Sequence, residues 1–224
     1  MFVGHFGLAF AAKRASPRSS LATLFAATAF LDLLWPVLVL AGIEKVRIEP
    51  GITAFSPFDF VSYPWSHSAA LALLWSVLFG VIVLAATRDR VSALVSGSLV
   101  FSHWVLDLVS HRPDLPLWPG GPRVGLGLWY SIPATLAVEG AIFAVGVWMY
   151  TASTRPRDRI GRWALAGLVA LLSAAYLSDR LGGPPPPSDM AVAWVGVAAA
   201  VIFLPWAGWA DRHRVTVEPH LAGA

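Results

Sequence analysis

A few ionisable residues interrupt the long apolar stretches of this chain, and they are of the types that bind metal ions. They are Asp32, His103, Asp107 and Glu139 inside apolar stretches, together with His5 and His67 close to the beginning of two others. A charged or titratable side chain at membrane depth is costly unless it is paired or hydrated. Six groups of this kind favour one shared site over six separately neutralised residues.

The strongest local pattern is His103-x3-Asp107-x3-His111. Residues four apart lie on one face of a helix, with about 6 Å between their Cβ atoms. This spacing lets two side chains ligate one ion without bending the backbone. His111 extends the same stripe if the helix continues so far.

The composition defines the elements that position these residues. Of 224 residues 57% are hydrophobic and only 13% are charged, which is too few to cover the surface of a water-soluble domain. We therefore predict an all-α, polytopic membrane helix bundle, with about six spans of about 20 residues each. The expected spans are 21–42, 67–87, 91–110, 128–150, 163–178 and 189–209.

A shorter apolar stretch at 2–12 precedes these spans. It is too short to cross a membrane, since a helix rises about 1.5 Å per residue. A cleaved signal peptide is the alternative, but Lys13 and Arg14 follow the stretch and no positive charge precedes it. We expect a half-inserted helix that packs inside the bundle, because such a segment must be covered by protein or face a wet cavity.

The basic residues gather in alternate loops. Eleven of the sixteen Lys and Arg residues lie in 13–20, 88–90, 151–162 and after 209. The positive-inside rule places these segments in the cytoplasm, with the C-terminus. The net charge of +3 thus reflects topology and not nucleic-acid binding, because no loop combines a long basic run with interleaved aromatic residues.

This topology brings the ionisable residues to one side of the membrane. His67 begins its span at the outer side, Asp107 lies near the outer end of its span, and His103 lies one turn deeper. Asp32 and Glu139 lie near the midplane, so that all can meet in a funnel open to the outer face. His213 and His220 belong to the polar C-terminal tail and are not expected in the site.

The remaining segments complete a single membrane domain over 1–224. Loop 43–66 carries charged and aromatic residues, and it is either an interfacial anchor or a lid over the site. Loop 111–127 is turn-rich, and 182–188 forms a stiff Pro-rich connector. We expect 1–150 to bear the site, and 151–224 to form scaffold helices and a tail.

Several short stretches together resemble a known family. They are Gly4-His5, Ser66-His67-Ser68, Ser102-His103-x3-Asp107 and Pro116-Leu117-Trp118-Pro119, with Asp32 following an apolar run. In this order, over about residues 1–145, they resemble the YdjM-like membrane-bound metal-dependent hydrolases of bacteria. The family typically shows Pro-Asp-x-Asp-His where this chain has Leu31-Asp32-Leu33-Leu34-Trp35, so only Asp32 carries over.

The resemblance implies a bacterial inner-membrane hydrolase with a divalent metal ion. The chain has no cysteine, so the ligands would be His5, Asp32, His67, His103, Asp107 and His111. Zinc is the first expectation, and manganese or iron the second, because imidazole and carboxylate suit all three. The ion would lower the pKa of a bound water, and Glu139 or Asp32 would accept its proton.

Aromatic residues near the funnel predict a lipid ester, a lipid phosphoester or another amphiphile as substrate. The sequence also leaves two other classes open. Buried Asp, Glu and His residues occur in proton-coupled transporters, and they also tie helices together in structural membrane proteins. The site has no Gly-x-Ser-x-Gly or His-Glu-x-x-His motif, so a serine hydrolase or a standard zincin has no support.

Overall fold

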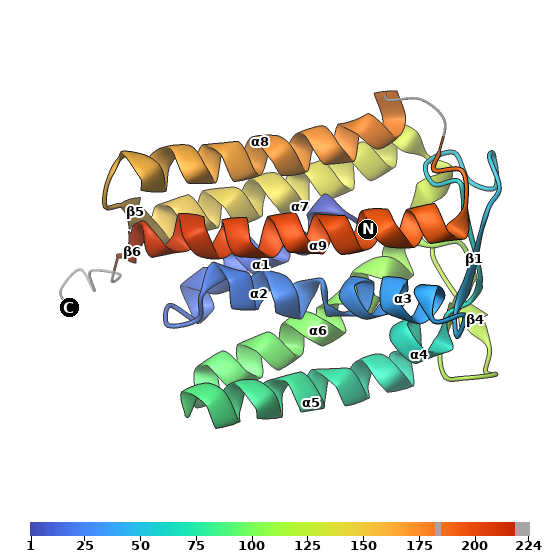
Figure 1. Ribbon diagram of the computed structural model, residues 1–224, viewed down its shortest axis with the longest axis horizontal. Coiled ribbons are helices and arrows are strands. Elements are labelled where there is room, and N and C mark those ends of the chain that lie inside the picture. The colour runs from blue at the N-terminus through green and yellow to red at the C-terminus, as the bar shows by residue number, and fades with distance from the viewer. Residues whose placement is uncertain (182–184, 218–224) are drawn as a thin grey trace.

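The computed structural model describes residues 1–181 and 185–217, which form a bundle of helices with short strand pairs at its two ends (Figure 1). The helices are α1 (Val3–Ala15), α2 (Leu21–Thr28), α3 (Phe30–Leu40), α4 (Pro64–His67), α5 (Ala69–Thr87), α6 (Arg90–Ser110), α7 (Ile132–Ser153), α8 (Arg159–Leu181) and α9 (Asp189–Arg212), with a 3₁₀ turn, η1 (Leu128–Tyr130). This architecture confirms the predicted all-α bundle.

Three antiparallel strand pairs close the loops. β1 (Lys45–Ile48) pairs with β2 (Phe58–Ser62), β3 (Leu115–Pro116) with β4 (Arg123–Val124), and β5 (Thr154–Pro156) with β6 (Arg214–Thr216). The first pair has an irregular register between Lys45 and Arg47. These strands were not predicted, because each is too short to show an alternating pattern.

Five of the described helices are long and apolar enough to cross a membrane: α5, α6, α7, α9 and residues Arg159–Ser178 of α8. The bent pair of α2 and α3 adds a sixth candidate span. The outward face of α5 is apolar, since Leu73, Val77 and Ile82 are all more than half exposed. An exposed apolar face of this kind favours a membrane over water as its surroundings. The predicted number of about six spans agrees with this count.

The apolar run 21–42, predicted as one span, consists of two helices. It bends by 58° between α2 and α3, at Ala29. The last carbonyl groups of a helix have no partner within that helix. The break therefore leaves the Thr28 carbonyl free to accept a hydrogen bond from another helix, and the new helix begins at Phe30, two residues before Asp32.

Helix α1 lies inside the bundle, as its length and sequence predicted. Its main contact is with α7, where the two backbones almost touch. A Cβ atom added at Gly146 would lie 2.0 Å from the carbonyl oxygen of Gly7, and one added at Gly7 would lie 2.6 Å from that of Ile142. Only glycine allows this approach, and it places His5 in the middle of the protein.

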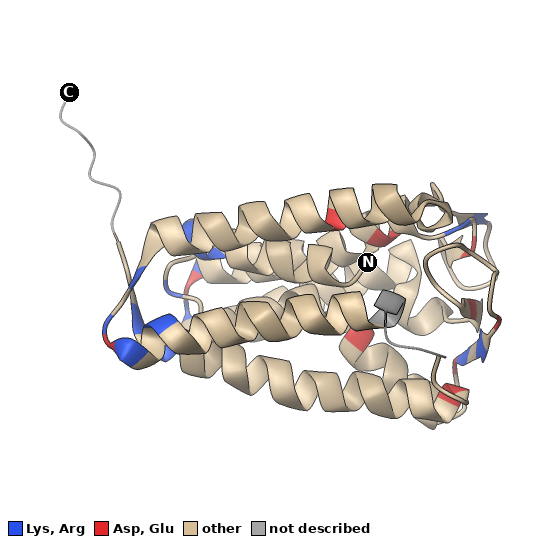
Figure 2. Cartoon of the chain, turned by 90° about the horizontal axis from the view of Figure 1, so that it is seen from above, with Lys and Arg blue, Asp and Glu red and all other residues tan. Residues whose placement is uncertain are grey.

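The two ends of the bundle differ in charge. Loops 13–20, 88–90 and 151–162 gather at the end that carries β5 and β6, where Lys13 Nζ lies 2.8 Å from Asp211 Oδ2. Figure 2 shows most Lys and Arg residues at this end, and several acidic residues deeper in the bundle. Loops 43–66 and 111–127 meet at the opposite end, where Arg123 donates to the carbonyl of Val61. The part of the connector at 182–184, and His220, lie outside the described residues.

Candidate metal centre

The His103 and Asp107 side chains of α6 lie side by side in the interior. His103 Nε2 is 3.1 Å from Asp107 Oδ2, and both side chains are almost completely buried. The predicted helical spacing therefore brings the imidazole and the carboxylate together. Asp107 lies near the C-terminal end of α6, which ends three residues later at Ser110.

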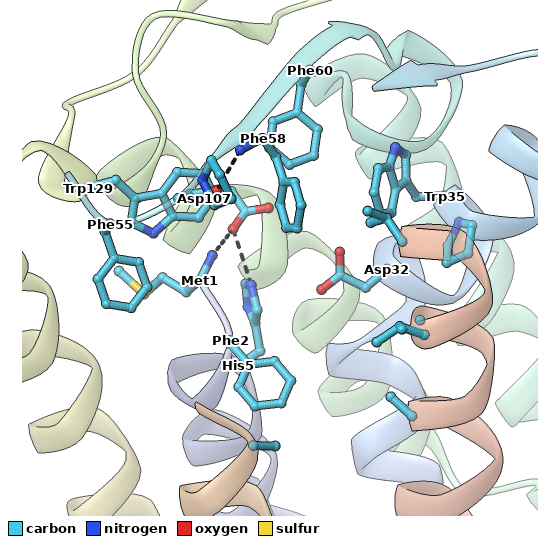
Figure 3. Close-up of a pocket in the computed structure, with 18 of the residues that line it drawn as sticks. Met1, Phe2, His5, Asp32, Trp35, Phe55, Phe58, Phe60, Asp107 and Trp129 are labelled. Carbon is cyan, nitrogen blue, oxygen red and sulfur yellow. Dashed lines mark hydrogen bonds and ion pairs between the residues drawn. The ribbon is translucent and has the colours of Figure 1, made fainter. Parts of the chain in front are cut away.

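Asp107 is the shared partner of residues from several elements. His5 Nε2 of α1 lies 3.2 Å from its Oδ1 atom, and the α-amino group of Met1 lies 2.5 Å from the same oxygen (Figure 3). The Nε2 atoms of His67 and His111 lie 3.8 and 3.9 Å from its Oδ2 atom. One carboxylate thus joins segments that are more than a hundred residues apart.

Asp32 approaches the same histidines from the opposite side. Its Oδ1 atom lies 3.5 Å from His67 Nε2 and 3.7 Å from His103 Nε2. Two triplets have ligand atoms within 4.8 Å of one another, namely His5, His103 and Asp107, and Asp32, His67 and His103. Five of the six predicted ligands belong to these triplets. The sixth, His111, belongs to neither, although its Nε2 atom lies 3.9 Å from Asp107 Oδ2.

The Nδ1 atoms of two histidines each lie beside an oxygen that accepts hydrogen bonds. His103 Nδ1 lies 2.7 Å from the carbonyl oxygen of Thr28, and His111 Nδ1 lies 3.0 Å from Asp114 Oδ1. Each Nδ1 atom must therefore donate, which leaves the lone pair of a neutral ring on Nε2. This support of the outer nitrogen is the arrangement found around metal-ligating histidines.

Several polar atoms of the site have no hydrogen-bond partner in the described residues. They are His103 Nε2, His5 Nδ1 and Glu139 Oε1, all buried. A buried polar atom without a partner costs free energy. A cation would satisfy the lone pair of His103 and the surrounding carboxylates together, so the donor set fits a divalent metal ion.

Glu139 lies on α7 beside the N-terminus of α1. Its Oε2 atom accepts hydrogen bonds from the backbone amides of Phe2, at 2.7 Å, and Gly4, at 3.3 Å. A carboxylate is favourable at a helix N-terminus. Glu139 therefore anchors α1 with one oxygen, while the other stays unpartnered, and it is not a member of either ligand triplet.

A cavity of about 700 Å³ connects this cluster with the surrounding surface. The inner wall contains His5, Asp32, His67, Asp107, His111 and Glu139, and the described lining residues include no Lys or Arg. Figure 3 shows Phe55, Phe58, Phe60 and Trp129 around the same space. Residues 50–58 thus form a rim of the cavity, which supports the lid alternative for loop 43–66.

Helices α8 and α9 complete the wall of this cavity. Small and apolar residues of α9, including Gly196, Ala199 and Phe203, face the space opposite the cluster. Val195 also lines it and is 60% exposed. Segment 151–224, which was predicted to be scaffold, therefore contributes surface to the candidate site. Its described residues provide no member of the two ligand triplets.

Some residues of the site were missed by the sequence analysis. Tyr63 donates to Asp114 Oδ1 at 3.1 Å, and burial together with the Asp114 carboxylate raises the pKa of Tyr63 well above its usual range. The phenol therefore remains a neutral donor. Glu44 and Ser66 lie behind His67. The only sequence signal was the position of Ser66 beside His67, since Glu44 resembled an ordinary loop charge.

Comparison of the chain with protein-family models, with curated proteins and with solved structures gave no match. The interpretation of the site therefore depends on its own geometry.

Proposed function

We propose that this chain is a membrane-embedded metal-dependent hydrolase that acts on a lipid ester, a lipid phosphoester or another amphiphile. The observation that carries the proposal is the cluster of imidazoles and carboxylates beside a cavity, with the shared His103 imidazole oriented by an acceptor at Nδ1. His5, Asp32, His67, His103 and Asp107 would hold the metal, and zinc is the first candidate. A bound divalent ion supplies a Lewis acid and lowers the pKa of water.

Asp32 is the best placed proton acceptor. Its side chain is 46% exposed, whereas the side chains of His67, His103 and Asp107 are at most 4% exposed. The carboxylate therefore faces the cavity while it lies beside two of the candidate ligands. Hydrolysis requires a base that removes a proton from water as the water oxygen attacks, and a proton must reach the leaving alcohol. Glu139 Oε1 is the second acceptor on the cavity wall.

The cavity favours a substrate with both polar and apolar parts. One side presents carboxylates and imidazoles, and the other presents aromatic rings and the apolar face of α9. Pockets for small ligands combine an apolar wall with few polar groups in this way. No Lys or Arg lines the described wall, and the Met1 α-amino group there already pairs with Asp107, so an anionic phosphoester would depend on the metal for its charge balance.

The proposal includes the setting of the site. The chain would be a bacterial inner-membrane protein of the YdjM-like family, with the basic end of the bundle in the cytoplasm and the site facing outward. The gathering of the basic loops at one end supports this orientation. Alkaline phosphatase fused after residue 224 should be inactive, and the same enzyme inserted in loop 111–127 should be active. The reverse pattern would contradict the orientation.

Metal analysis and lipid turnover test the function itself. We expect the protein purified in detergent to contain near-stoichiometric zinc, manganese or iron. Reconstituted with a bacterial lipid extract, it should release a lipid fragment that mass spectrometry detects, and Asp32→Asn should release at least about 100-fold less. A folded protein that binds no divalent metal would contradict the metal centre. Bound metal without turnover of ester or phosphoester lipids would contradict the lipid hydrolase.

A further inference from the structure

Glu44 is a buried acidic residue whose partners are all hydrogen-bond donors from α4. It lies four residues after the end of α3 and is 1% exposed. Its Oε1 atom accepts from the backbone amides of Trp65, at 2.8 Å, and Ser66, at 2.9 Å. Its Oε2 atom accepts from the hydroxyl of Ser66 at 2.6 Å. No salt bridge joins Glu44 to a basic residue in the described part of the chain.

The Ser66 hydroxyl links this carboxylate to His67. Ser66 Oγ lies 2.7 Å from His67 Nδ1. A hydroxyl has one proton to donate, and the 2.6 Å contact with a carboxylate oxygen is much shorter than the alternative 3.5 Å contact with the Tyr63 carbonyl. With its proton committed to Glu44, Ser66 Oγ must accept the proton of His67 Nδ1.

The opposite nitrogen of His67 then carries the lone pair. His67 Nε2 lies 3.5 Å from Asp32 Oδ1 and 3.8 Å from Asp107 Oδ2. His103 and His111 reach the same state through an acceptor at Nδ1, but His67 has a hydroxyl there, which could donate or accept. Something else must therefore decide the direction of the hydrogen bond between Ser66 and His67.

We propose that Glu44 is a positioning residue that fixes His67 in the tautomer with Nε2 free to bind the metal. This inference rests on the proposed metal centre. The competing explanation is purely structural, because Glu44 also holds two backbone amides at the beginning of α4. The two explanations separate at the Ser66 hydroxyl, which belongs to the relay and not to the amide contacts.

Two substitutions test the relay in different ways. Ser66→Ala removes the hydroxyl and leaves both amide contacts of Glu44 intact. Glu44→Gln keeps the shape, but its amide nitrogen donates to Ser66 Oγ, so the hydroxyl turns toward His67 and the ring proton moves to Nε2. Ser68→Ala is the matched control, because Ser68 is equally buried and its hydroxyl oxygen accepts from the backbone amide of Leu71.

The first measurement is the zinc dissociation constant of the full-length protein in detergent, by competition with a chromophoric chelator. We expect Ser66→Ala and Glu44→Gln each to weaken binding by about 10 to 100-fold, the usual effect of losing a group behind a metal-ligating histidine. Ser68→Ala should bind zinc like the parent. Parent-like affinity in both Ser66→Ala and Glu44→Gln would overturn the proposal.

The second measurement is the tautomer of His67 in the metal-free protein, from its ¹⁵N chemical shifts. The parent should show the proton on Nδ1, and Glu44→Gln should show it on Nε2. An unchanged tautomer in folded Glu44→Gln would overturn the relay, and Ser66→Ala decides the question by its zinc affinity if Glu44→Gln does not fold. A parent that binds no zinc would instead contradict the metal centre, while the tautomer still reports on Glu44.

Discussion

The two ends of the bundle both bury charged and polar side chains, but they satisfy them in different ways. At the basic end, Lys13 Nζ donates to the Ser19 carbonyl and to Asp211, and Asp211 also accepts from the Tyr150 hydroxyl at 2.7 Å. At the opposite end, His103 Nε2 and Glu139 Oε1 make no hydrogen bond with any residue that the structure describes. The first arrangement satisfies its polar groups within the protein, whereas the second leaves buried polar atoms that the proposed metal ion would satisfy.

This difference teaches how a structural polar cluster can be distinguished from a functional one. Both clusters have charges of opposite sign within a few ångströms, so burial and charge alone do not separate them. The decisive feature is the balance of donors and acceptors. Around Asp211 the donors match the acceptors. Asp107 also has donors, Met1 and His5, but His5 Nδ1, His103 Nε2 and Glu139 Oε1 nearby make no hydrogen bond within the described residues.

The largest expected effect is the loss of metal on removal of the central ligands. His103→Ala and Asp107→Ala should each reduce the metal content of purified protein to a small fraction of the parent value, by elemental analysis. Both should still fold, because apolar helix contacts hold the bundle. His213→Ala is the control, since His213 lies at the basic end and pairs with Asp158. Parent-like metal content in both variants would remove them from the ligand set.

Glu139→Gln tests whether the negative charge of Glu139 is needed for hydrolysis. In Glu139→Gln the remaining carbonyl oxygen can still accept the amides of Phe2 and Gly4, so α1 should stay in place. If Glu139 accepts a proton during hydrolysis, lipid turnover should fall by about 100 to 10,000-fold. Parent-like turnover would assign Glu139 to the anchoring of α1 alone. Thermal unfolding in detergent checks that the fold is intact.

Several features of the fold and of the candidate site could be predicted from the sequence, because they depend on local patterns. The six spans follow from apolar runs, and the contact of His103 with Asp107 follows from a four-residue spacing on one helix. The buried position of α1 followed from its short length. Each of these features depends on residues close together in the chain.

The features that the sequence did not reveal depend on distant pairs. The bend at Ala29 has no proline or glycine to mark it, yet it frees the Thr28 carbonyl for His103. Glu44 and Ser66 are 22 residues apart, and the β1–β2 pair lies between them in the chain. A loop carboxylate that supports a histidine cannot be told from a solvated one until the fold places it.

A substitution at Gly146 tests whether the candidate metal centre depends on the close contact of α1 with α7. In Gly146→Val the new side chain would meet the Gly7 backbone, so we expect a loss of stability of more than about 3 kcal/mol, or failure to fold. Folded protein should bind metal more weakly, because α1 carries His5. Gly140→Ala on the same helix is the matched control, since nothing lies within 4 Å of its Cβ position. Equal stability of the two variants would contradict the contact.

Lys13 provides the corresponding test of the basic end. Lys13→Met removes the cation from Asp211, and breaking one side of a buried ion pair costs about 3 kcal/mol. The thermal midpoint should therefore fall, but the metal content of the folded fraction should not change. Lys45→Met is the matched control, because Lys45 is exposed. A loss of metal in Lys13→Met would contradict the independence of the two ends.

The smallest effect is expected at Asp89, the partly exposed carboxylate that caps the N-terminus of α6 at the basic end. It accepts from the Ser92 hydroxyl at 2.6 Å and from the Ser92 amide, and the hydroxyl contact holds the pKa of Asp89 below its usual value. A lowered pKa means that the stabilising contribution is complete above the ordinary pKa of aspartate. It disappears as the pH falls through the lowered value.

Asp89→Ala should therefore reduce the thermal midpoint slightly at pH 7, and the difference from the parent should shrink in acid. Asp89→Asn separates the two contributions of this residue. It keeps an acceptor oxygen for the helix cap but has no charge to titrate, so its difference from the parent should be smaller at pH 7. Metal content should stay unchanged in both variants. A pH-independent difference for Asp89→Ala would show that the cap acts without its charge, since only a charged cap can titrate in this range.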